Sequence, residues 1–208
     1  DSKVHLLRNN QLVEKNADMS TLTKRYTDEA IDFIEKNDEQ PFFLYLAHTM
    51  PHTKLAVSDE FKGKSEGGYY GDVIEEIDFN VGRIFKKLKD NGLDENTYVI
   101  FSSDNGPWWI KGDHGGNSAP LRGAKTSAWE GGLRVPCIIR APGKVPAGKT
   151  VDQVLATIDL LPTLAEMAGA LIPTDRVIDG LDISDILHGK TTDLDRPFFY
   201  YQHHILRA

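Results

Sequence analysis

The chain has 208 residues, enough for one domain with a full hydrophobic core, and 40% hydrophobic with 26% charged residues is typical of a globular protein. The net charge of −7 argues against a nucleic-acid-binding surface, and no run of 18 apolar residues predicts a membrane-spanning helix. The one cysteine, Cys137, excludes an internal disulfide framework.

Two long helices are predicted in the first half of the chain. Residues 20–36 place apolar side chains on one helical face, with Ser20 as the N-cap. Residues 69–91 show the same pattern more strongly, and Gly92 follows where a helix C-cap belongs. Between the helices, the run 42–46 is apolar on both faces, which predicts a central parallel strand followed by a loop.

The second half of the chain alternates short apolar runs with turns and helices. A polar loop at 104–134 contains all three tryptophans and is too long for a simple connection, so we expect it to be functional. Strands that alternate with helices indicate an α/β fold with a largely parallel sheet flanked by helices. The other elements predicted in this half are strands at 97–102, 136–139, 154–156 and 198–202, and helices at 159–168 and 184–187.

An acid and an amide follow the strand predicted at 97–102. In open α/β sheets, ligands bind beyond the carboxyl ends of the strands. The Asp104 carboxylate and the Asn105 amide oxygen are hard donors of the kind that Ca²⁺ and Mg²⁺ bind. The alternative interpretation is a turn, because Asp-Asn-Gly-Pro is favourable turn chemistry by itself.

Basic side chains also follow the predicted strand ends. His52 comes after the strand at 42–46, where a histidine can transfer a proton or hold an anion. The long loop adds His114, Arg122 and Lys125, and lysine is a compact positive charge for an anionic ester. Each of these side chains alone is equally consistent with a solvated loop residue. Together with the oxygen donors, they predict a metal-assisted site for a sulfate or phosphate ester.

Six sequence segments, spread over most of the chain, form a family pattern. The segments resemble those of the type I sulfatases, the arylsulfatase family within the alkaline phosphatase superfamily, and they occur in the same order. The presence of SDNG, LRGAK and WEGGLRVP in one chain is the most specific part of the resemblance. The segments are PFFLYLAHTMPHT (41–53), GYYGDVIEEIDFNVGRI (68–84), YVIFSSDNGPW (98–108), APLRGAKTSAWEGGLRVPCIIRAPG (119–143), ATIDLLPTLAEMAG (156–169) and RPFFYY (196–201).

The resemblance implies a sulfuric ester hydrolase with the alkaline-phosphatase-like fold. Asp104 and Asn105 match the family's second pair of ligands to Ca²⁺, with Mg²⁺ less expected. His52 matches the histidine that contacts the sulfate and protonates the leaving oxygen. Lys125 matches the lysine that neutralises the sulfate and the leaving group. These placements stabilise charge where it develops in the transition state.

The resemblance leaves the substrate open within one chemical class. Trp108, His114 and Arg122 are expected to bind substrate, and the first and second of these lie where specificity varies in the family. A sulfated sugar or an aryl sulfate is the expected substrate. Two alternatives stay open, a phosphodiesterase or phosphonate hydrolase of the same superfamily and a non-catalytic protein that binds sulfated glycans.

The family's nucleophile is not found in this chain. It is a formylglycine, made from Cys or Ser in a Cys/Ser-x-Pro-Ser/Ala-Arg motif, and it attacks sulfur as its hydrate. Cys137 lacks the proline and the spacing. Residues 118–122 fit the pattern loosely, but they follow the Asp-Asn pair, whereas the family places its nucleophile well before the histidine. The formylglycine and the first pair of aspartate ligands are therefore expected upstream of the chain.

These absences predict a fragment. Residues 1–195 are expected to be the middle and later part of the catalytic domain, and 196–208 the truncated start of the C-terminal subdomain. The fragment is expected to be inactive by itself, because removing a nucleophile costs many orders of magnitude in turnover. The chain contains no N-glycosylation motif, and members of the family it resembles are usually exported from the cytoplasm. We therefore expect a periplasmic or secreted bacterial protein.

Overall fold

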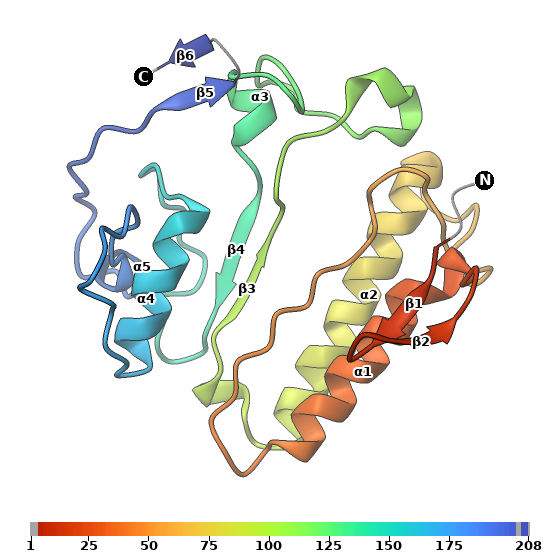
Figure 1. The fold of residues 1–208 in the computed structure, drawn as a ribbon, viewed down its shortest axis with the longest axis horizontal. Coiled ribbons are helices and arrows are strands. Elements are labelled where there is room, and N and C mark those ends of the chain that lie inside the picture. The colour runs from red at the N-terminus through yellow and green to blue at the C-terminus, as the bar shows by residue number, and fades with distance from the viewer. Residues whose placement is uncertain (1–3, 203–204, 208) are drawn as a thin grey trace.

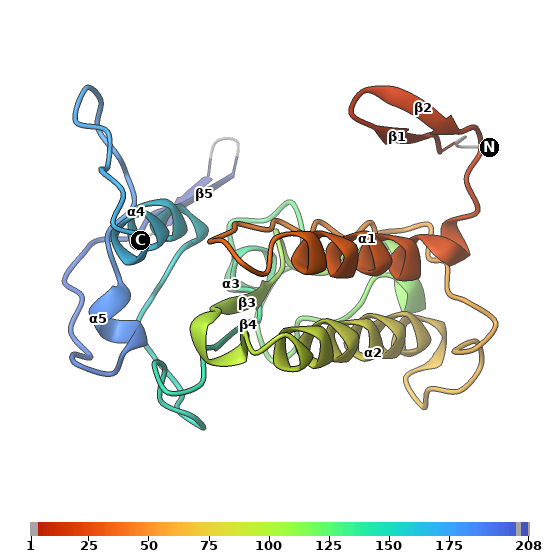
Figure 2. The ribbon, with the colours of Figure 1, turned by 90° about the horizontal axis from the view of Figure 1, so that it is seen from below.

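A pair of long helices forms the largest feature of the fold. The structure is a computed structural model that describes residues 4–202 and 205–207. Helices α1 (Leu22–Lys36) and α2 (Gly68–Asp90) lie side by side (Figures 1 and 2). Arg83 of α2 forms an ion pair with Asp28 of α1 at 2.5 Å. The two helices predicted from apolar periodicity are therefore confirmed.

The ends of these helices confirm one predicted cap and contradict the other. Gly92 has a φ of +69°, and the Leu93 amide donates to the Leu88 carbonyl at 2.8 Å, which is the Schellman arrangement expected of a glycine after a helix. Ser20 is not the N-cap of α1. A short 3-10 turn, η1 (Met19–Thr21), precedes the helix, and the Asp18 carboxylate caps that turn by accepting from the Ser20 amide at 3.0 Å.

The strands of the described residues form three separate antiparallel pairs rather than the predicted parallel sheet. In the central pair, Val99 lies opposite Arg140 and Ser102 opposite Cys137, because the long loop turns the chain back along the strand it left. The predicted strands at 97–102 and 136–139 are confirmed, and these two run antiparallel to each other within a fold for which a largely parallel sheet was expected. The pairs are β1 (Leu6–Arg8) with β2 (Gln11–Glu14), β3 (Val99–Ser102) with β4 (Cys137–Arg140), and β5 (Tyr200–Gln202) with β6 (Ile205–Arg207).

The segment 42–46 runs alongside α1 (Figures 1 and 2) but is not a strand. Its burial alternates: Phe43 and Tyr45 are 73% and 81% exposed, while Phe42 packs edge-on against Phe33 of α1 with the ring centroids 5.8 Å apart. No strand among the described residues pairs with it. A strand requires a hydrogen-bonded neighbour, so the apolar run by itself does not make one.

The remaining predictions are confirmed in part. The helices predicted at 159–168 and 184–187 correspond to α4 and α5, whereas 154–156 is not a strand and 198–202 forms strand only in β5. Four short elements were not predicted within the loops. The two predicted helices are α4 (Leu160–Met167) and α5 (Ser184–Leu187). The four elements not predicted are α3 (Glu130–Leu133), η2 (Asp94–Asn96), η3 (Trp109–His114) and η4 (Thr157–Asp159).

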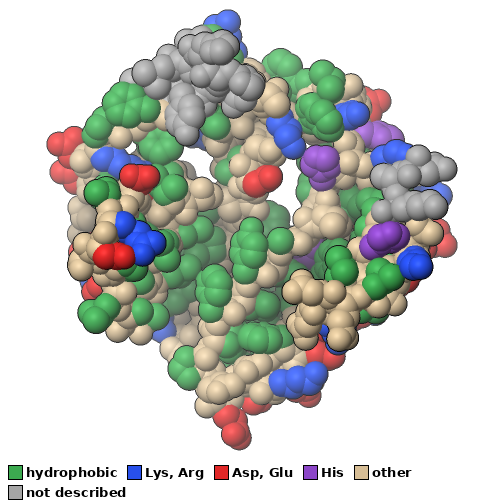
Figure 3. Space-filling model, in the orientation of Figure 1, with side chains coloured by type: hydrophobic (Ala, Val, Ile, Leu, Met, Phe, Trp, Pro, Cys, Tyr) green, Lys and Arg blue, Asp and Glu red, His purple; other side chains and the backbone are tan. Residues whose placement is uncertain are grey.

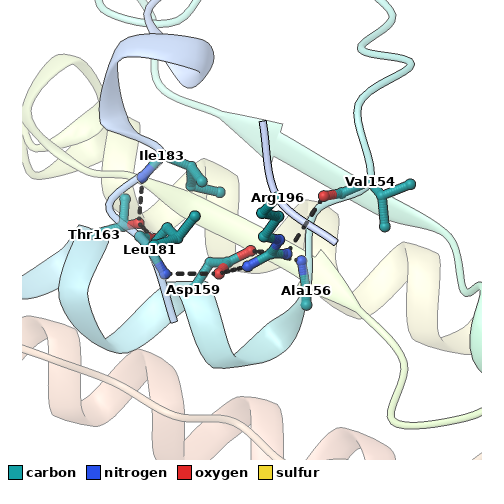
Figure 4. A network of polar contacts seen from close by, with 7 residues as sticks. All are labelled: Val154, Ala156, Asp159, Thr163, Leu181, Ile183 and Arg196. Carbon is teal, nitrogen blue, oxygen red and sulfur yellow. Dashed lines mark hydrogen bonds and ion pairs between the residues drawn. The ribbon is translucent and has the colours of Figure 1, made fainter. Parts of the chain in front are cut away.

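A buried ion pair joins the start of α4 to the segment that follows α5 (Figure 4). The Asp159 carboxylate is fully buried and accepts from two guanidinium nitrogens of Arg196 at 2.6 and 2.8 Å. It also accepts from the backbone amides of Ala156 and Leu181. Next to it, the Thr163 hydroxyl accepts from the Ile183 amide at 3.0 Å. These contacts hold the later part of the chain against α4.

One face of the molecule is rich in exposed apolar side chains. Figure 3 shows hydrophobic side chains across the centre of this face, where the surface is hollowed. Among the large apolar side chains, Phe43, Tyr45 and Ile138 are each more than 60% exposed. Apolar side chains that gather on one face are typical of a contact surface. None of the helices in the described part of the chain has both the length and the apolar character to cross a bilayer.

Candidate functional site

His52 is held between two anchored positions. Met50 and Leu55 are both buried, and they pack in one cluster with Val73 and Ile77 of α2. His52 lies between them and is exposed. Its backbone amide donates to the Thr49 carbonyl at 3.3 Å, so the imidazole projects from a turn whose two sides are fixed on the helix.

The long loop after β3 closes on itself through glycines. The Gly106 amide donates to the Gly132 carbonyl at 3.0 Å, and the Gly131 amide donates to the Arg122 carbonyl at 2.8 Å. A Cβ atom at Gly106 would lie 1.9 Å from the Gly131 carbonyl oxygen, which no side chain tolerates. The return of the loop to the sheet at residues 130–132 therefore depends on close backbone contact that only glycine permits.

Trp108 brings together residues that are far apart in the sequence. The His52 ring lies 5.8 Å from the Trp108 ring, centroid to centroid. The Lys125 ammonium nitrogen lies 5.5 Å from the same indole, and the Lys125 amide donates to the Pro107 carbonyl at 2.9 Å. A third cation, Lys111, lies 4.5 Å from the ring centroid. Three of the side chains predicted from the sequence thus meet at the long loop after β3, whose turn η3 contacts α2.

The hydrogen bond of His52 determines which ring nitrogen is available. Nδ1 lies 2.6 Å from the Thr53 carbonyl oxygen. Because a carbonyl can only accept, Nδ1 carries the proton in this bond. Among the described residues, none forms a hydrogen bond with Nε2. The ring is therefore oriented to exchange a proton through Nε2.

Asp104 and Asn105 directly follow Ser103 at the carboxyl end of β3. The Asn105 side-chain amide donates to Asp104 Oδ1 at 3.0 Å, and the Ser103 hydroxyl donates to the Asn105 carbonyl at 3.1 Å. Asp104 is exposed. Asn105 precedes Trp108 by three residues, so their Cα atoms lie within about 11 Å of each other.

The donor set of this pair fits part of a Ca²⁺ site. A carboxylate and an amide oxygen are suitable ligands, but Ca²⁺ takes roughly six to eight. Over the residues that the structure describes, no group of three or more His, Cys, Asp or Glu side chains is placed to hold a metal. The chain therefore offers two neighbouring oxygen side chains and does not complete a site by itself.

The other two predicted substrate-binding residues contact different rings. The His114 ring lies 5.7 Å from that of Tyr69, near the start of α2. The Arg122 guanidinium lies 3.6 Å from the Trp129 ring centroid. Both side chains are exposed. The structure thus groups His52, Trp108 and Lys125 but places His114 and Arg122 at neighbouring aromatic contacts.

Two basic side chains of this region, Lys111 and His48, were not predicted from the sequence as site residues. Lys111 follows a tandem tryptophan, which is the one signal that would have found it. His48 lies 6.4 Å from the Tyr26 ring, its Nδ1 is buried without a partner among the described residues, and burial lowers the pKa of the imidazole. Ser118 is buried and its hydroxyl donates to the Gly123 carbonyl at 2.8 Å.

Known proteins share this sequence pattern. Residues 4–170 match the family model described as Sulfatase. Human steryl-sulfatase is 40% identical over 201 residues, which covers 94% of this chain and 34% of that protein. The N-acetylgalactosamine-6-sulfatase of the dog, Canis lupus familiaris, is 42% identical over 193 residues, covering 91% and 37%. The chain therefore spans about a third of the length of these relatives.

The fold is also similar to that of a solved structure. The crystal structure of Ps i-CgsB in complex with k-i-k-neocarrahexaose superposes with a TM-score of 0.85 and 32% sequence identity. The superposition covers 97% of this chain and 45% of that chain. The expected family resemblance is thus found independently in sequence and in backbone geometry.

Proposed function

The chain belongs to the sulfatase family, and on this premise we propose that the protein containing it hydrolyses sulfate esters. The relatives named above are sulfatases of steroid and sugar sulfates, and the similar solved structure holds a carbohydrate. A sulfated sugar is the proposed substrate, with aryl sulfates as the simpler substrates for assay. The relatives favour sulfate over phosphate or phosphonate esters.

The convergence on Trp108 carries this proposal. A lysine ammonium and an imidazole from separate loops lie within 6 Å of one indole, three residues after the oxygen pair at the end of β3. An imidazole, an ammonium group and a pair of oxygen donors, which a site for an anionic ester uses, thus lie close to one loop.

Lys125 and His52 have distinct proposed roles. The Lys125 ammonium pairs with the sulfate oxygens and stabilises the charge that develops on them as the sulfur–oxygen bond breaks. His52 acts as the imidazolium: Nδ1–H stays on the Thr53 carbonyl while the proton on Nε2 passes to the leaving oxygen, which leaves the ring neutral. Trp108 keeps the two side chains at their relative positions and provides an apolar surface against the substrate.

Asp104 and Asn105 are proposed to supply two of the ligands to a bound Ca²⁺. When bound, the ion would neutralise negative charge on the sulfate. The remaining ligands and the formylglycine nucleophile are proposed to come from parts of the protein outside these 208 residues. The chemistry assigned to this chain is therefore charge neutralisation and proton donation.

The test uses the full-length protein and two substrates that differ in leaving group. N-acetylgalactosamine 6-sulfate releases a sugar alkoxide, which needs a proton, whereas 4-nitrophenyl sulfate releases a stable phenolate. His52→Ala is expected to lower kcat/KM by about 10²- to 10⁴-fold on the sugar sulfate and much less on the aryl sulfate. Lys125→Ala is expected to lower it by about 10²- to 10³-fold on both.

Lys149→Ala is the control, because Lys149 is an exposed lysine on the loop after β4. It is expected to leave both substrates unaffected. Equal losses on both substrates for His52→Ala would contradict the proton-donor role. Faster cleavage of 4-nitrophenyl phosphate or phosphonate than of the sulfate would contradict the proposed function.

A further inference from the structure

Lys111 provides a positive charge at the candidate site that the proposed reaction does not use. We propose that Lys111 determines specificity by binding a second anionic group, a sulfate or a carboxylate, on a sugar that carries the scissile sulfate. The inference rests on the proposed function and narrows its substrate class. The dianionic sugar would place its scissile sulfate at Lys125 and its second anion at Lys111.

The two lysines share one aromatic ring. Lys111 lies 4.5 Å and Lys125 5.5 Å from the Trp108 centroid. Their ammonium groups are therefore separated by no more than roughly 10 Å, about one Debye length at 0.1 M salt. Two cations at this distance repel each other, and the indole compensates only part of that cost. A bound anion at each lysine removes the repulsion.

Neither lysine is neutralised from within the chain. Throughout the described ranges, no carboxylate lies at ion-pair distance from Lys111 or Lys125, and the nearby Asp113 forms no ion pair. Lysines elsewhere do find such partners, as in Lys24 with Asp28 at 2.6 Å. Unpaired lysines are common on surfaces, but these two differ from the rest because both contact the ring beside His52.

The backbone fixes where Lys111 can reach. The Lys111 amide donates to the Trp108 carbonyl at 3.0 Å, and the Trp108 amide donates to the Gly115 carbonyl at 2.9 Å. A Cβ atom at Gly115 would lie 2.1 Å from the Trp108 carbonyl oxygen, so the closure depends on glycine. The backbone of Lys111 is therefore held in a closed loop, which limits the positions that its ammonium group can reach.

The same turn offers apolar surface beside the charge. Trp109 and Ile110 are 54% and 77% exposed. Exposed apolar side chains next to a site are available to pack against a ligand. A sugar bearing an anionic group matches this surface, because it presents both a charged substituent and the apolar face of a ring. An aryl monosulfate offers no second anion for Lys111.

The experiment compares one-anion and two-anion substrates with the full-length protein. The probes are N-acetylgalactosamine 6-sulfate, N-acetylgalactosamine 4,6-disulfate and the unsaturated chondroitin 6-sulfate disaccharide, which pairs a sulfate with a carboxylate. Lys111→Ala is expected to raise KM about fivefold on the two dianionic probes with kcat little changed, as for one partly exposed ion pair. Lys111→Arg is expected to retain most of the affinity, and Lys149→Ala should behave as wild type.

The outcomes separate this inference from the proposed function. An equal KM increase on the monosulfate would overturn it, since both lysines would then hold one sulfate. A loss for only one of the two dianionic probes identifies the second anion as sulfate or carboxylate. If no sulfate ester is cleaved, the proposed function fails, and calorimetry of the same probes decides the inference. The inference is supported if the wild type binds the dianionic probes more tightly than the monosulfate and Lys111→Ala loses this difference. It is refuted if the wild type binds all three probes with equal affinity.

Discussion

The buried pair of Asp159 and Arg196 makes the sharpest stability prediction. Arg196→Ala leaves a fully buried carboxylate with only the amides of Ala156 and Leu181 as donors. Breaking a buried ion pair from one side typically costs about 3 to 5 kcal/mol, because the other charge stays buried without its partner. The lower figure applies here since two donors remain. The loss should appear at α4, whose start Asp159 anchors.

The assay is amide hydrogen exchange of α4 in the full-length protein. A loss of about 3 kcal/mol in local opening free energy lowers protection on the order of 100-fold, since each ~1.4 kcal/mol is tenfold. The matched control is Arg176→Ala. Arg176 also contacts Asp175 through two nitrogens, at 3.0 and 2.6 Å, but both side chains are about two-thirds exposed. That variant should leave protection unchanged, because exposed ion pairs contribute little.

Arg196→Lys keeps the charge but loses the paired geometry, so it should fall between wild type and Arg196→Ala. It also keeps the test decisive if the alanine variant does not fold. Equal protection of α4 in Arg196→Ala and Arg176→Ala would refute the reasoning, because burial would then make no difference to the stability that an ion pair contributes.

Three further predictions follow from the same structure. Burial lowers the pKa of His48, so the folded state binds fewer protons than the unfolded state near neutral pH. The free energy of unfolding should therefore be highest above about pH 7 and fall as the pH drops through 6.5. Urea titrations of His48→Gln should show a smaller fall than those of the wild type. Gly106→Ala forces its methyl group against the Gly131 carbonyl and should abolish cleavage of 4-nitrophenyl sulfate by the full-length protein. The control is Gly82→Ala, which has open space in the interior of α2 and should raise the free energy of unfolding by about 1 kcal/mol in denaturant titrations. In calorimetry, the 208-residue chain alone should bind Ca²⁺ weakly, and it should cleave no 4-nitrophenyl sulfate. In the full-length protein, Asp104→Ala should weaken calcium binding. Tight binding of Ca²⁺ to the chain alone would contradict the incomplete donor set.

Local periodicity predicted the helices well because it reports on features within each element. The apolar face of α2 and the glycine after it are properties of neighbouring residues, and both are confirmed. The hairpin of β1 and β2 was missed, although Asn9 and Asn10 both have positive φ values of 49° and 65°, as a two-residue hairpin turn requires. Asn-Asn is a weaker hairpin signal than Asn-Gly.

Pairing between distant segments was beyond the reach of the pattern. The run 42–46 has the composition of a strand, but strand formation depends on a neighbour, and none of the described strands supplies one. The antiparallel direction of β4 depends on how the long loop closes through Gly106 and Gly131. Apolar content alone carries no information about that direction.

The candidate site was predictable from side-chain chemistry and from the family resemblance, although the strand expected before His52 is absent from the described strands. His52, Lys125 and Trp108 were predicted separately, and the structure brings them together. Lys111 was missed because a lysine in a polar loop looks like any solvated lysine until its ring contact is seen. Contacts between side chains of different loops are set by tertiary packing, which sequence spacing does not encode.

Peptide-mapping mass spectrometry of the full-length protein tests the central proposal most directly. A sulfatase should carry, upstream of this chain, a Cys/Ser-x-Pro-x-Arg peptide in which the Cys or Ser has been converted to formylglycine. That result would make His52, Lys125, Asp104 and Asn105 part of a sulfate-cleaving site. An unmodified threonine, serine or cysteine at that place, or no such motif, would contradict sulfate-ester hydrolysis by this mechanism.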